Sequence, residues 1–363
     1  MNPIQLFIPG PVPVADDVLE VLSRPVVAHY GPQCVSDYNR TTGLLNQLLG
    51  SSGETMIIAG SGSAALDMAV NSVVEKGAKV ILVNNGFFGW RLKDMLVRHS
   101  AKVIEIAGEW GKPIEAGRIE DALKKTPGVR AVLTTHCETS CGILNPIEDI
   151  GRIVKTTDAL FIVDGVTSIG GERYCHDEWG IDISVTASQK CLACSPGLSV
   201  ASFSRKAVDY INNRKTKPAG WYLNPAVWFE YIDKWKDWHP YPMTLPINPI
   251  LSLQRSLETI IQEGIEKRIN RHRSAAAEIR SALRSMGYKM VASDSDCAGA
   301  VTAVKLKDSS RLQEYLKKEH HIQIANGLAE THNQWFRIGH MGDIGTRPEY
   351  YQKAIDAISQ FKR

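Results

Sequence analysis

The sequence predicts an α/β protein with a large, mostly parallel sheet domain and a smaller C-terminal α/β domain. Short apolar runs between Gly and Asn residues are typical of buried strands. Segments of helical length separate them, and strands that alternate with helices form parallel sheets covered on both faces. Leu198–Phe203 follows closely on the last of these runs and is expected as an edge or reversed strand. The expected strands are 79–83, 102–106, 129–134, 159–163 and 181–185, with helices at 90–100, 118–126 and 146–156.

The C-terminal third of the chain has its own pattern. From Ile250, apolar residues follow helical spacing as far as 269, which predicts one long helix that could bridge two domains. We therefore expect an N-terminal arm (1–17), a large domain (18–262) and a small domain (263–363). In the small domain we expect strands 299–307, 321–325 and 335–340 and helices 309–319 and 348–361.

The composition is that of an enzyme-sized globular protein. Of 363 residues, 44% are hydrophobic and 22% charged, which excludes disordered and fibrous classes. A formal net charge of +3 is too near balance to indicate a nucleic-acid or membrane surface. Seven cysteines, an odd number, disfavour a disulfide framework and favour a reducing compartment, so a cytoplasmic location is expected. We expect no secretory signal at the start, no targeting motif at 360–363, and no apolar run near the roughly 20 residues of a membrane span.

One segment, 213–248, is unusually rich in large aromatic residues and is interrupted by prolines. It is either a long ordered excursion packed on the core or an interface segment, and the sequence leaves both open. Its aromatic residues include Trp221, Tyr222, Trp228, Phe229, Trp235 and Trp238.

Small residues open a helix at 59–65, where the sequence is AGSGSAA. Such a loop exposes free backbone N–H groups at the positive end of the helix dipole, so Ser61, Gly62 and Ser63 could form a phosphate cup. Taken alone the signal is weak. Glycine–serine turns before helices are common, and the spacing matches neither the dinucleotide fingerprint nor a P-loop.

Two further polar residues follow predicted strands. Asp164 lies at the edge where open α/β sheets bind ligands, although a turn-capping role is the alternative. Lys190 could form a Schiff base with a carbonyl group, although most lysines are simply solvated. Together with the cup, these residues provide what pyridoxal phosphate requires, namely an anion cradle, a partner for the pyridine nitrogen and an amine.

Arg337 lies within the expected strand 335–340 of the small domain. The planar fork of its guanidinium suits a carboxylate, so it is a candidate for binding an amino acid substrate. A surface ion pair is the alternative.

With these motifs the chain resembles the class V aminotransferases of fold-type I, most closely the alanine–glyoxylate and serine–pyruvate aminotransferases. The resemblance extends from Pro9 to Gly339. It implies the pyridoxal-phosphate-dependent transferase fold and a homodimer with shared active sites. The matching segments are 135–142, 163–171, 188–190, 214–218 and 244–246.

The resemblance implies a role for each matching residue. Lys190 would carry the cofactor and then act as general base and acid, Asp164 would keep the pyridine nitrogen protonated, and Arg337 would hold the substrate carboxylate. The other implied contacts are Ser61, Gly62, Ser63 and Gln189 at the phosphate, Thr139 near ring and substrate, Val166 under the ring, Phe88 stacked on it, and Tyr241 and Thr244 reaching the phosphate from the other subunit.

The activity implied is transamination of a small amino acid, alanine or serine, with glyoxylate or pyruvate. Close family members have His at the position of Ser63 and Trp at that of Phe88, so the substrate is less certain than the cofactor. In the sequence no second basic residue is evident to pair with a side-chain carboxylate. The alternatives are pyridoxamine–pyruvate, 2-aminoethylphosphonate–pyruvate and ureidoglycine–glyoxylate specificity, and the phosphate cup disfavours a substrate without phosphate such as pyridoxamine.

Two other classes of protein remain open. A cysteine desulfurase or lyase of the same fold needs a mobile nucleophilic cysteine and typically has His before the lysine, where this chain has Gln189. Cys34 and Cys297 are the candidate nucleophiles for that reading. A binding module without catalysis is suggested by the aromatic segment.

Four cysteines lie near the proposed site, as the pairs Cys191/Cys194 and Cys137/Cys141. They could bind metal or react with oxidants, together with His136. We expect no metal site, because no second pair has the spacing of a zinc ribbon, and we interpret these cysteines as small buried residues.

Overall fold

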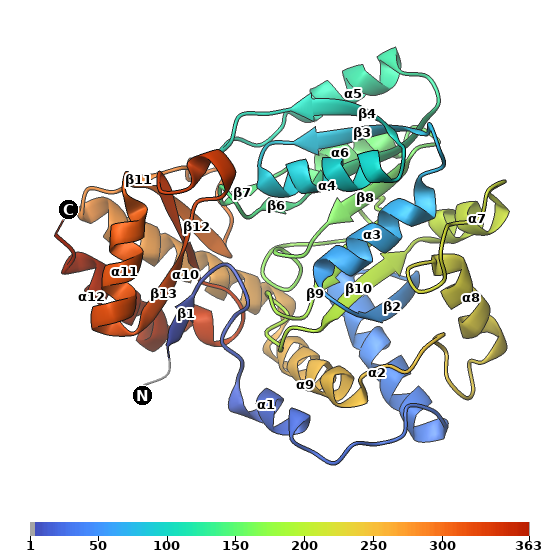
Figure 1. Ribbon diagram of the computed structural model, residues 1–363, viewed down its shortest axis with the longest axis horizontal. Coiled ribbons are helices and arrows are strands. Elements are labelled where there is room, and N and C mark those ends of the chain that lie inside the picture. Colours follow the sequence, from blue (N-terminus) through green and yellow to red (C-terminus); the bar gives the residue numbers. More distant parts are fainter. Residues whose placement is uncertain (1–3, 363) are drawn as a thin grey trace.

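The computed structural model describes residues 4–362 and shows two sheets, each with its own helices (Figure 1). Residues 1–3 and 363, on which part of the expectations about the two ends rests, lie outside the described residues. The large sheet has seven strands, in the spatial order β2 (Glu54–Ala59), β10 (Leu198–Phe203), β9 (Ile183–Ala187), β8 (Leu160–Asp164), β5 (Val129–Thr135), β3 (Lys79–Asn84) and β4 (Lys102–Ala107).

The large sheet is mixed because one of its strands is reversed. β10 pairs antiparallel with both β2 and β9, whereas the other neighbours are parallel. The expectation of a reversed strand at Leu198–Phe203 is therefore confirmed, but the strand is internal and not at an edge. β2, which the sequence analysis did not identify, forms the edge beside it. Every residue of β8, β9 and β10 is buried, so helices must cover both faces of the sheet.

Helices connect the strands of the large sheet much as expected, and the predicted helix bounds are wrong by at most three residues. The short hairpin of β6 (Cys137–Glu138) and β7 (Ile143–Leu144) follows β5 on the side that faces the small sheet (Figure 1). The helices of this part are α1 (Asp16–Leu22), α2 (Pro32–Leu49), α3 (Gly62–Val73), α4 (Phe87–Arg98), α5 (Ala116–Lys125), α6 (Ile147–Val154), α7 (Arg205–Asn213), α8 (Pro225–Lys234) and α9 (Ile247–Glu263).

The small sheet combines both ends of the chain. β1 (Gln5–Phe7) pairs in parallel with β13 (Ile322–Asn326), so the N-terminal segment is part of the small domain's sheet. The segment then crosses to the large sheet, and this crossing carries Pro9 into the space between the two parts. The other elements are α10 (Ile265–Ser285), β11 (Lys289–Met290), β12 (Val301–Lys305), α11 (Ser309–His320), β14 (Trp335–Gly339), α12 (Pro348–Ser359) and short 3₁₀ turns at Ala329–Thr331 and Ile344–Thr346.

The expectation of one continuous helix after Ile250 is wrong. The chain forms two helices, α9 and α10, which meet at Gly264. Gly264 has φ +88°, a left-handed conformation that favours glycine and that no helix interior allows. Apolar spacing continues through this residue, which is why the sequence pattern does not reveal the break. The domain boundaries after residues 17 and 262 stay a prediction.

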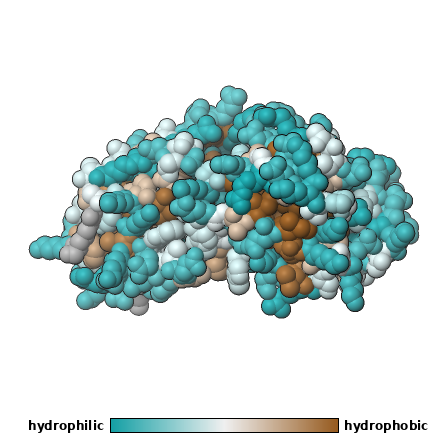
Figure 2. Space-filling model, turned by 90° about the horizontal axis from the view of Figure 1, so that it is seen from above, coloured by the Kyte–Doolittle hydropathy of each residue, from teal (hydrophilic) through white to brown (hydrophobic). Residues whose placement is uncertain are grey.

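The face seen in Figure 2 is mostly hydrophilic, and its largest group of hydrophobic side chains lies on the side of the large sheet. Within residues 4–362 no helix is long and apolar enough to cross a membrane.

The large aromatic residues of the segment 213–248 differ in burial. Trp228 and Phe229 are buried in the core, whereas Trp221, Tyr222, Trp235 and Trp238 are exposed.

Candidate active site

The carboxyl ends of β2, β8 and β9 meet at one edge of the large sheet, and a cavity of about 350 Å³ lies there. Residues far apart in the sequence line it because parallel strands end at the same edge. Nine of the twelve residues proposed from the sequence are among them. The lining residues are Gly10, Pro11, Ser61, Gly62, Ser63, Phe88, Arg91, Cys137, Thr139, Asp164, Val166, Thr167, Gln189 and Lys190.

Lys190 follows β9 and points into this cavity. Its Nζ donates a hydrogen bond to the backbone oxygen of Pro9, in the segment that crosses between the sheets. A Cβ at Gly10 would lie 2.6 Å from Lys190 Cδ, so a larger residue there would displace the lysine side chain, and the φ of +87° at Gly10 itself favours glycine. Burial and the charge of Arg337 lower the pKa of Lys190 to about 8. The amine is therefore much closer to its neutral, nucleophilic form at pH 7 than an exposed lysine is.

Asp164 is the last residue of β8 and is buried. Its Oδ1 accepts a hydrogen bond from the backbone N–H of Val166 at 3.0 Å. Burial raises the pKa of the carboxyl, while the Val166 N–H and the positive charges of Arg91 and Lys190 oppose that rise. A cationic pyridine nitrogen at this carboxylate would stabilise the charged form further.

The start of α3 provides the anion cradle. Ser61 is the N-cap residue, but no side chain caps the free N–H groups of the first turn. A Cβ at Gly62 would lie 2.9 Å from Val166 Cγ2, so a side chain there would close the cradle. The buried Oε1 of Gln189 has no hydrogen-bond partner. This oxygen is an acceptor, so only the amide NH₂ of Gln189 could bind a phosphate. The uncapped N–H groups and a cavity lined by a lysine and an aspartate fit pyridoxal phosphate.

Phe88 and Val166 both line the cavity, as the resemblance implies for residues that hold a ring between them. Phe88 lies in the first turn of α4, and the guanidinium carbon of Arg91, one turn further on, is 4.7 Å from the centre of its ring. Thr139 hydrogen-bonds the hydroxyl of Thr167 at 2.7 Å.

Arg337, on β14 of the small sheet, is buried and does not line this cavity, but it lies beside the lining residue Thr139. Its Nε donates to the backbone oxygen of Asn326 at 2.9 Å, and its Nη1 lies 3.4 Å from the backbone oxygen of Thr139. Burial lowers its pKa to about 10. The guanidinium is thus held at the boundary between the two sheets, beside Thr139 and within electrostatic reach of Lys190.

Tyr241 and Thr244 lie outside this cavity. Tyr241 is fully buried in its own chain, where its hydroxyl donates to the backbone oxygen of His29 at 2.5 Å and lies 2.9 Å from the sulfur of Cys34. Thr244 is exposed. Their predicted contact with the phosphate of another subunit stays a prediction, and Thr244 is the better placed of the two.

Sequence reasoning missed several residues of the site. Arg91 is a second basic residue in the cavity wall, and its buried Nε has no hydrogen-bond partner. This corrects the expectation that no such residue is present. Thr167 also lines the cavity, and Glu138, which does not, stands in the chain between the lining residues Cys137 and Thr139. Arg91 follows Phe88 by three residues and so lies on the same face of the helix. This spacing predicts a place in the site for Arg91 only after Phe88 has been placed there.

The cysteines are free thiols in the part of the chain that the structure describes. Burial raises the pKa of Cys137, Cys141, Cys191 and Cys194. No group of three or more metal-ligating side chains is present among residues 4–362. Cys34 and Cys297, the candidate nucleophiles of a desulfurase, do not line the cavity.

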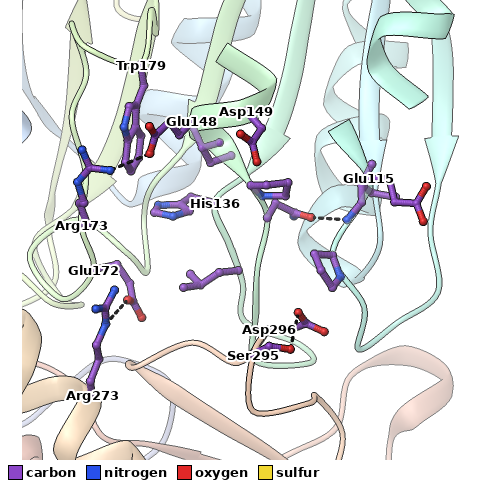
Figure 3. A pocket seen from close by; sticks show the side chains of 16 residues that line it. Glu115, His136, Glu148, Asp149, Glu172, Arg173, Trp179, Arg273, Ser295 and Asp296 are labelled. Carbon is purple, nitrogen blue, oxygen red and sulfur yellow. Dashed lines mark hydrogen bonds and ion pairs between the residues drawn. The ribbon is translucent and has the colours of Figure 1, made fainter. Parts of the chain in front are cut away.

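A second cavity of about 490 Å³ lies on the other side of the β5–β6 segment (Figure 3). His136 faces it, whereas Cys137, the next residue, lines the first cavity. Glu172 and Arg273 approach each other across this space from the large and the small domain. The second cavity therefore marks the junction between the two domains.

Comparison with known proteins shows the family. Residues 21–341 match the model of aminotransferase class V, and the chain belongs to that family. It is 35% identical over 345 residues to an uncharacterized aminotransferase of Methanocaldococcus jannaschii, with 94% of this chain and 89% of that protein covered. It is 30% identical to an L-aspartate–glyoxylate aminotransferase of Paracoccus denitrificans, covering 94% and 87%.

The fold leads to the same family. The crystal structure of an alanine–glyoxylate aminotransferase from Nostoc sp. superposes with a TM-score of 0.94 at 30% identity, covering 99% of this chain and 95% of that one. The protein is an aminotransferase with the fold-type I architecture, and its family implies pyridoxal phosphate as cofactor.

Proposed function

We propose that the protein is a pyridoxal-phosphate-dependent transaminase that moves the amino group of alanine or serine to glyoxylate or pyruvate. The observation that carries this proposal is that Lys190 and Asp164 line one cavity, while Arg337 of the other sheet lies beside its lining residue Thr139 and within electrostatic reach of Lys190. Glyoxylate is favoured as acceptor, because the Paracoccus and Nostoc relatives are both named for it.

When bound, pyridoxal phosphate supplies an aldehyde that takes up the amino group and a ring that withdraws electrons from the substrate. Ser61, Gly62, Ser63 and Gln189 would hold its phosphate. Asp164 would keep the ring nitrogen protonated, and Phe88 and Val166 would fix the plane of the ring.

Lys190 and Arg337 would act on the substrate. Arg337 would bind the carboxylate of the amino acid through its guanidinium fork, which orients the Cα–H bond. Lys190, once its amine is released, would remove the proton from Cα and return it at the neighbouring cofactor carbon. Its lowered pKa suits both the acceptance and the release of that proton near neutral pH.

A homodimer with shared sites is part of this proposal. Large apolar side chains are exposed along 24–31 and 235–244, two segments joined by the hydrogen bond from Gly31 N to Trp238 O. Val26 is 90% exposed, and the exposed rings of Tyr30, Trp238 and Trp235 contact one another on the same surface, so the exposed apolar residues form a patch of the kind that marks interfaces. Thr244 belongs to the same surface.

An acidic donor is the second candidate, favoured by Arg91. Its guanidinium lines the cavity and could pair with the side-chain carboxylate of aspartate. The Paracoccus relative is named for aspartate as donor. Steady-state kinetics of the holoenzyme with alanine, serine, aspartate and glutamate, each against glyoxylate and pyruvate, decides between the two.

Replacement of Arg337 extends this test. Arg337→Lys should impair all α-amino acid donors together, because lysine keeps the charge but not the fork. The highest kcat/KM with aspartate or glutamate would overturn the small-donor proposal. The role of Arg337 would be overturned by an amine without a carboxylate that reacts faster than alanine and reacts at the same rate in the wild type and in Arg337→Lys. Sulfide release from cysteine without any oxo acid would instead indicate a desulfurase.

A further inference from the structure

Glu138 is a buried carboxylate beside the active site to which the proposed function gives no role. It ends β6 and lies between Cys137 and Thr139, both of which line the cavity. Its side chain does not line the cavity and is fully buried. A buried carboxylate is costly unless its oxygens are hydrogen-bonded, so the partners of Glu138 are informative.

Four hydrogen bonds surround the carboxylate. Oε2 accepts from the backbone N–H of Phe88 at 3.1 Å and of Gly89 at 3.0 Å. Oε1 accepts from the backbone N–H of Ser140 at 3.0 Å and from its hydroxyl at 2.6 Å. Burial raises the pKa of Glu138, and these donors oppose the rise by stabilising the charged form.

Two of those donors belong to the first turn of α4. This helix has no capping side chain of its own, since its N-cap residue is Gly86. Glu138 therefore caps it from another strand, and a carboxylate at a helix N-terminus also meets the positive end of the dipole. A Cβ at Gly86 would lie 2.3 Å from Glu138 Cγ, so glycine is required there for the carboxylate to approach.

The helix turn that Glu138 caps is the one that carries Phe88. The backbone N–H of Phe88 is bound directly, so the carboxylate determines where this aromatic ring enters the cavity. On its other side Glu138 is followed by Thr139, whose backbone oxygen contacts Arg337 Nη1 at 3.4 Å. The negative charge of Glu138 also stabilises the charged guanidinium of Arg337.

We propose that Glu138 is a positioning residue, which places Phe88 against the cofactor ring by capping helix α4 from the neighbouring hairpin. The inference rests on the proposed function, because it requires pyridoxal phosphate in the cavity. Glu138 touches neither cofactor nor substrate in this role. It acts through Phe88, and this dependence can be measured.

A double-mutant cycle on cofactor affinity tests the proposal. Apo protein is titrated with pyridoxal phosphate, and the dissociation constant is measured by absorbance and by the circular dichroism of the bound chromophore. Glu138→Gln puts an NH₂ group against backbone donors on one side, so it should weaken cofactor binding by about tenfold or more. Phe88→Ala should also weaken it. The double variant should bind no more weakly than Phe88→Ala alone, because both changes remove the same contact.

Ser140 also caps α4, because its hydroxyl accepts a hydrogen bond from the backbone N–H of Phe87 at 3.0 Å, so it is no control. Asp182→Asn is the matched control. Asp182 is a buried carboxylate that accepts from the backbone N–H of Phe161 and from the hydroxyl of Ser204, and it does not line the cavity. This variant should lower the melting temperature without changing cofactor affinity. If Glu138→Gln does not fold, Glu138→Asp replaces it in the cycle, because aspartate keeps the charge but withdraws it from α4.

The outcomes separate this inference from the proposed function. Wild-type protein that does not bind pyridoxal phosphate would overturn the proposed function, and the inference with it. Wild-type protein that binds, together with Glu138 variants of unchanged affinity, would overturn the inference alone. Additive losses in the double variant, or an unchanged affinity in Phe88→Ala, would also show that Glu138 does not act through Phe88.

Discussion

At the scale of single residues, burial gives the active site its chemistry. The same removal from water lowers the pKa of Lys190 and Arg337 and raises that of Asp164. Opposite charges nearby limit each shift. The result is an amine that can lose its proton near neutral pH beside a carboxylate and a guanidinium that can stay charged.

Lys190 should react with pyridoxal phosphate in a pH-dependent way. The neutral amine is the nucleophile, so the rate of covalent attachment to apo protein should rise with pH and reach half its maximum near pH 8, not near the value of about 10.4 of a free lysine. Stopped-flow absorbance across pH 6–10 measures this, and borohydride reduction followed by peptide mapping identifies the lysine. A labelled peptide without Lys190, or label in Lys190→Ala, would contradict the assignment.

Asp164→Asn should leave the cavity nearly unchanged in shape and slow catalysis strongly. It removes the negative partner of the ring nitrogen, and electrostatic contributions of this kind are worth about 2.7–4 kcal/mol, or roughly 10²–10³ in kcat. Steady-state kinetics with the preferred donor measures the loss. A kcat within a few-fold of the wild-type value would show that Asp164 does not have this role.

At the scale of elements, contacts between the two domains hold the site together. Glu172, in the segment between β8 and β9, accepts a hydrogen bond from the backbone N–H of Gly299 in the small domain. Arg273 of α10 lies 4.0 Å from the same carboxylate (Figure 3). Arg268 of α10 donates to the backbone oxygens of Gly170 and Cys191, both near the cavity. α10 therefore fixes the small domain, and with it Arg337, against the large sheet.

Glu172 should make stability depend on pH. Burial raises its pKa from 4.5 to about 7, so the folded state holds this proton more tightly than the unfolded chain does. Stability should therefore fall as pH rises from about 4.5 to 7 and change no further above that range, by up to about 3 kcal/mol in all.

Glu172→Gln keeps an oxygen for Gly299 and removes the titration. The melting temperature of Glu172→Gln minus that of the wild type should increase from pH 5 to pH 7 and stay constant above pH 7, because only the wild type loses stability in this range. Glu148→Gln is the control for the loss of a carboxylate, because Glu148, like Glu172, lines the second cavity at the domain junction. A difference between Glu172→Gln and wild type that does not vary with pH would show that Glu172 does not titrate in this range.

At the scale of the whole molecule, the exposed apolar residues between α1 and α2 belong to the proposed dimer surface. Val26→Glu should shift the protein from dimer to monomer in analytical ultracentrifugation, because a charge would be buried in the contact. Val97→Glu, which alters another exposed valine on α4, is the control and should leave the assembly unchanged. A wild-type protein that sediments as a monomer, or a Val26→Glu variant that stays dimeric, would contradict the proposed dimer surface.

Local patterns in the sequence determine most of the large domain and the chemistry of the site. Strand and helix periodicity depends on neighbouring residues, so the parallel strands and the helices between them are predictable. Asp164 and Lys190 follow predicted strands, and the cup at 61–63 opens a predicted helix. Parallel strands end at one edge, so their convergence follows from the strand assignments. Arg337 was a candidate from its own strand and its guanidinium fork, and the resemblance supplied Phe88 and Thr139.

The tertiary structure alone decided features that depend on contacts between distant segments. Apolar spacing is the same on both sides of Gly264, so only the backbone conformation shows where α9 ends. Strand direction is not encoded in the apolar run of β10, which left its place between β2 and β9 undetermined. Arg91 and Glu138 acquire their roles because α4 packs against the β6–β7 hairpin, about 50 residues away in the chain. Composition and spacing describe each segment separately, whereas burial and pKa shifts arise only where the segments meet.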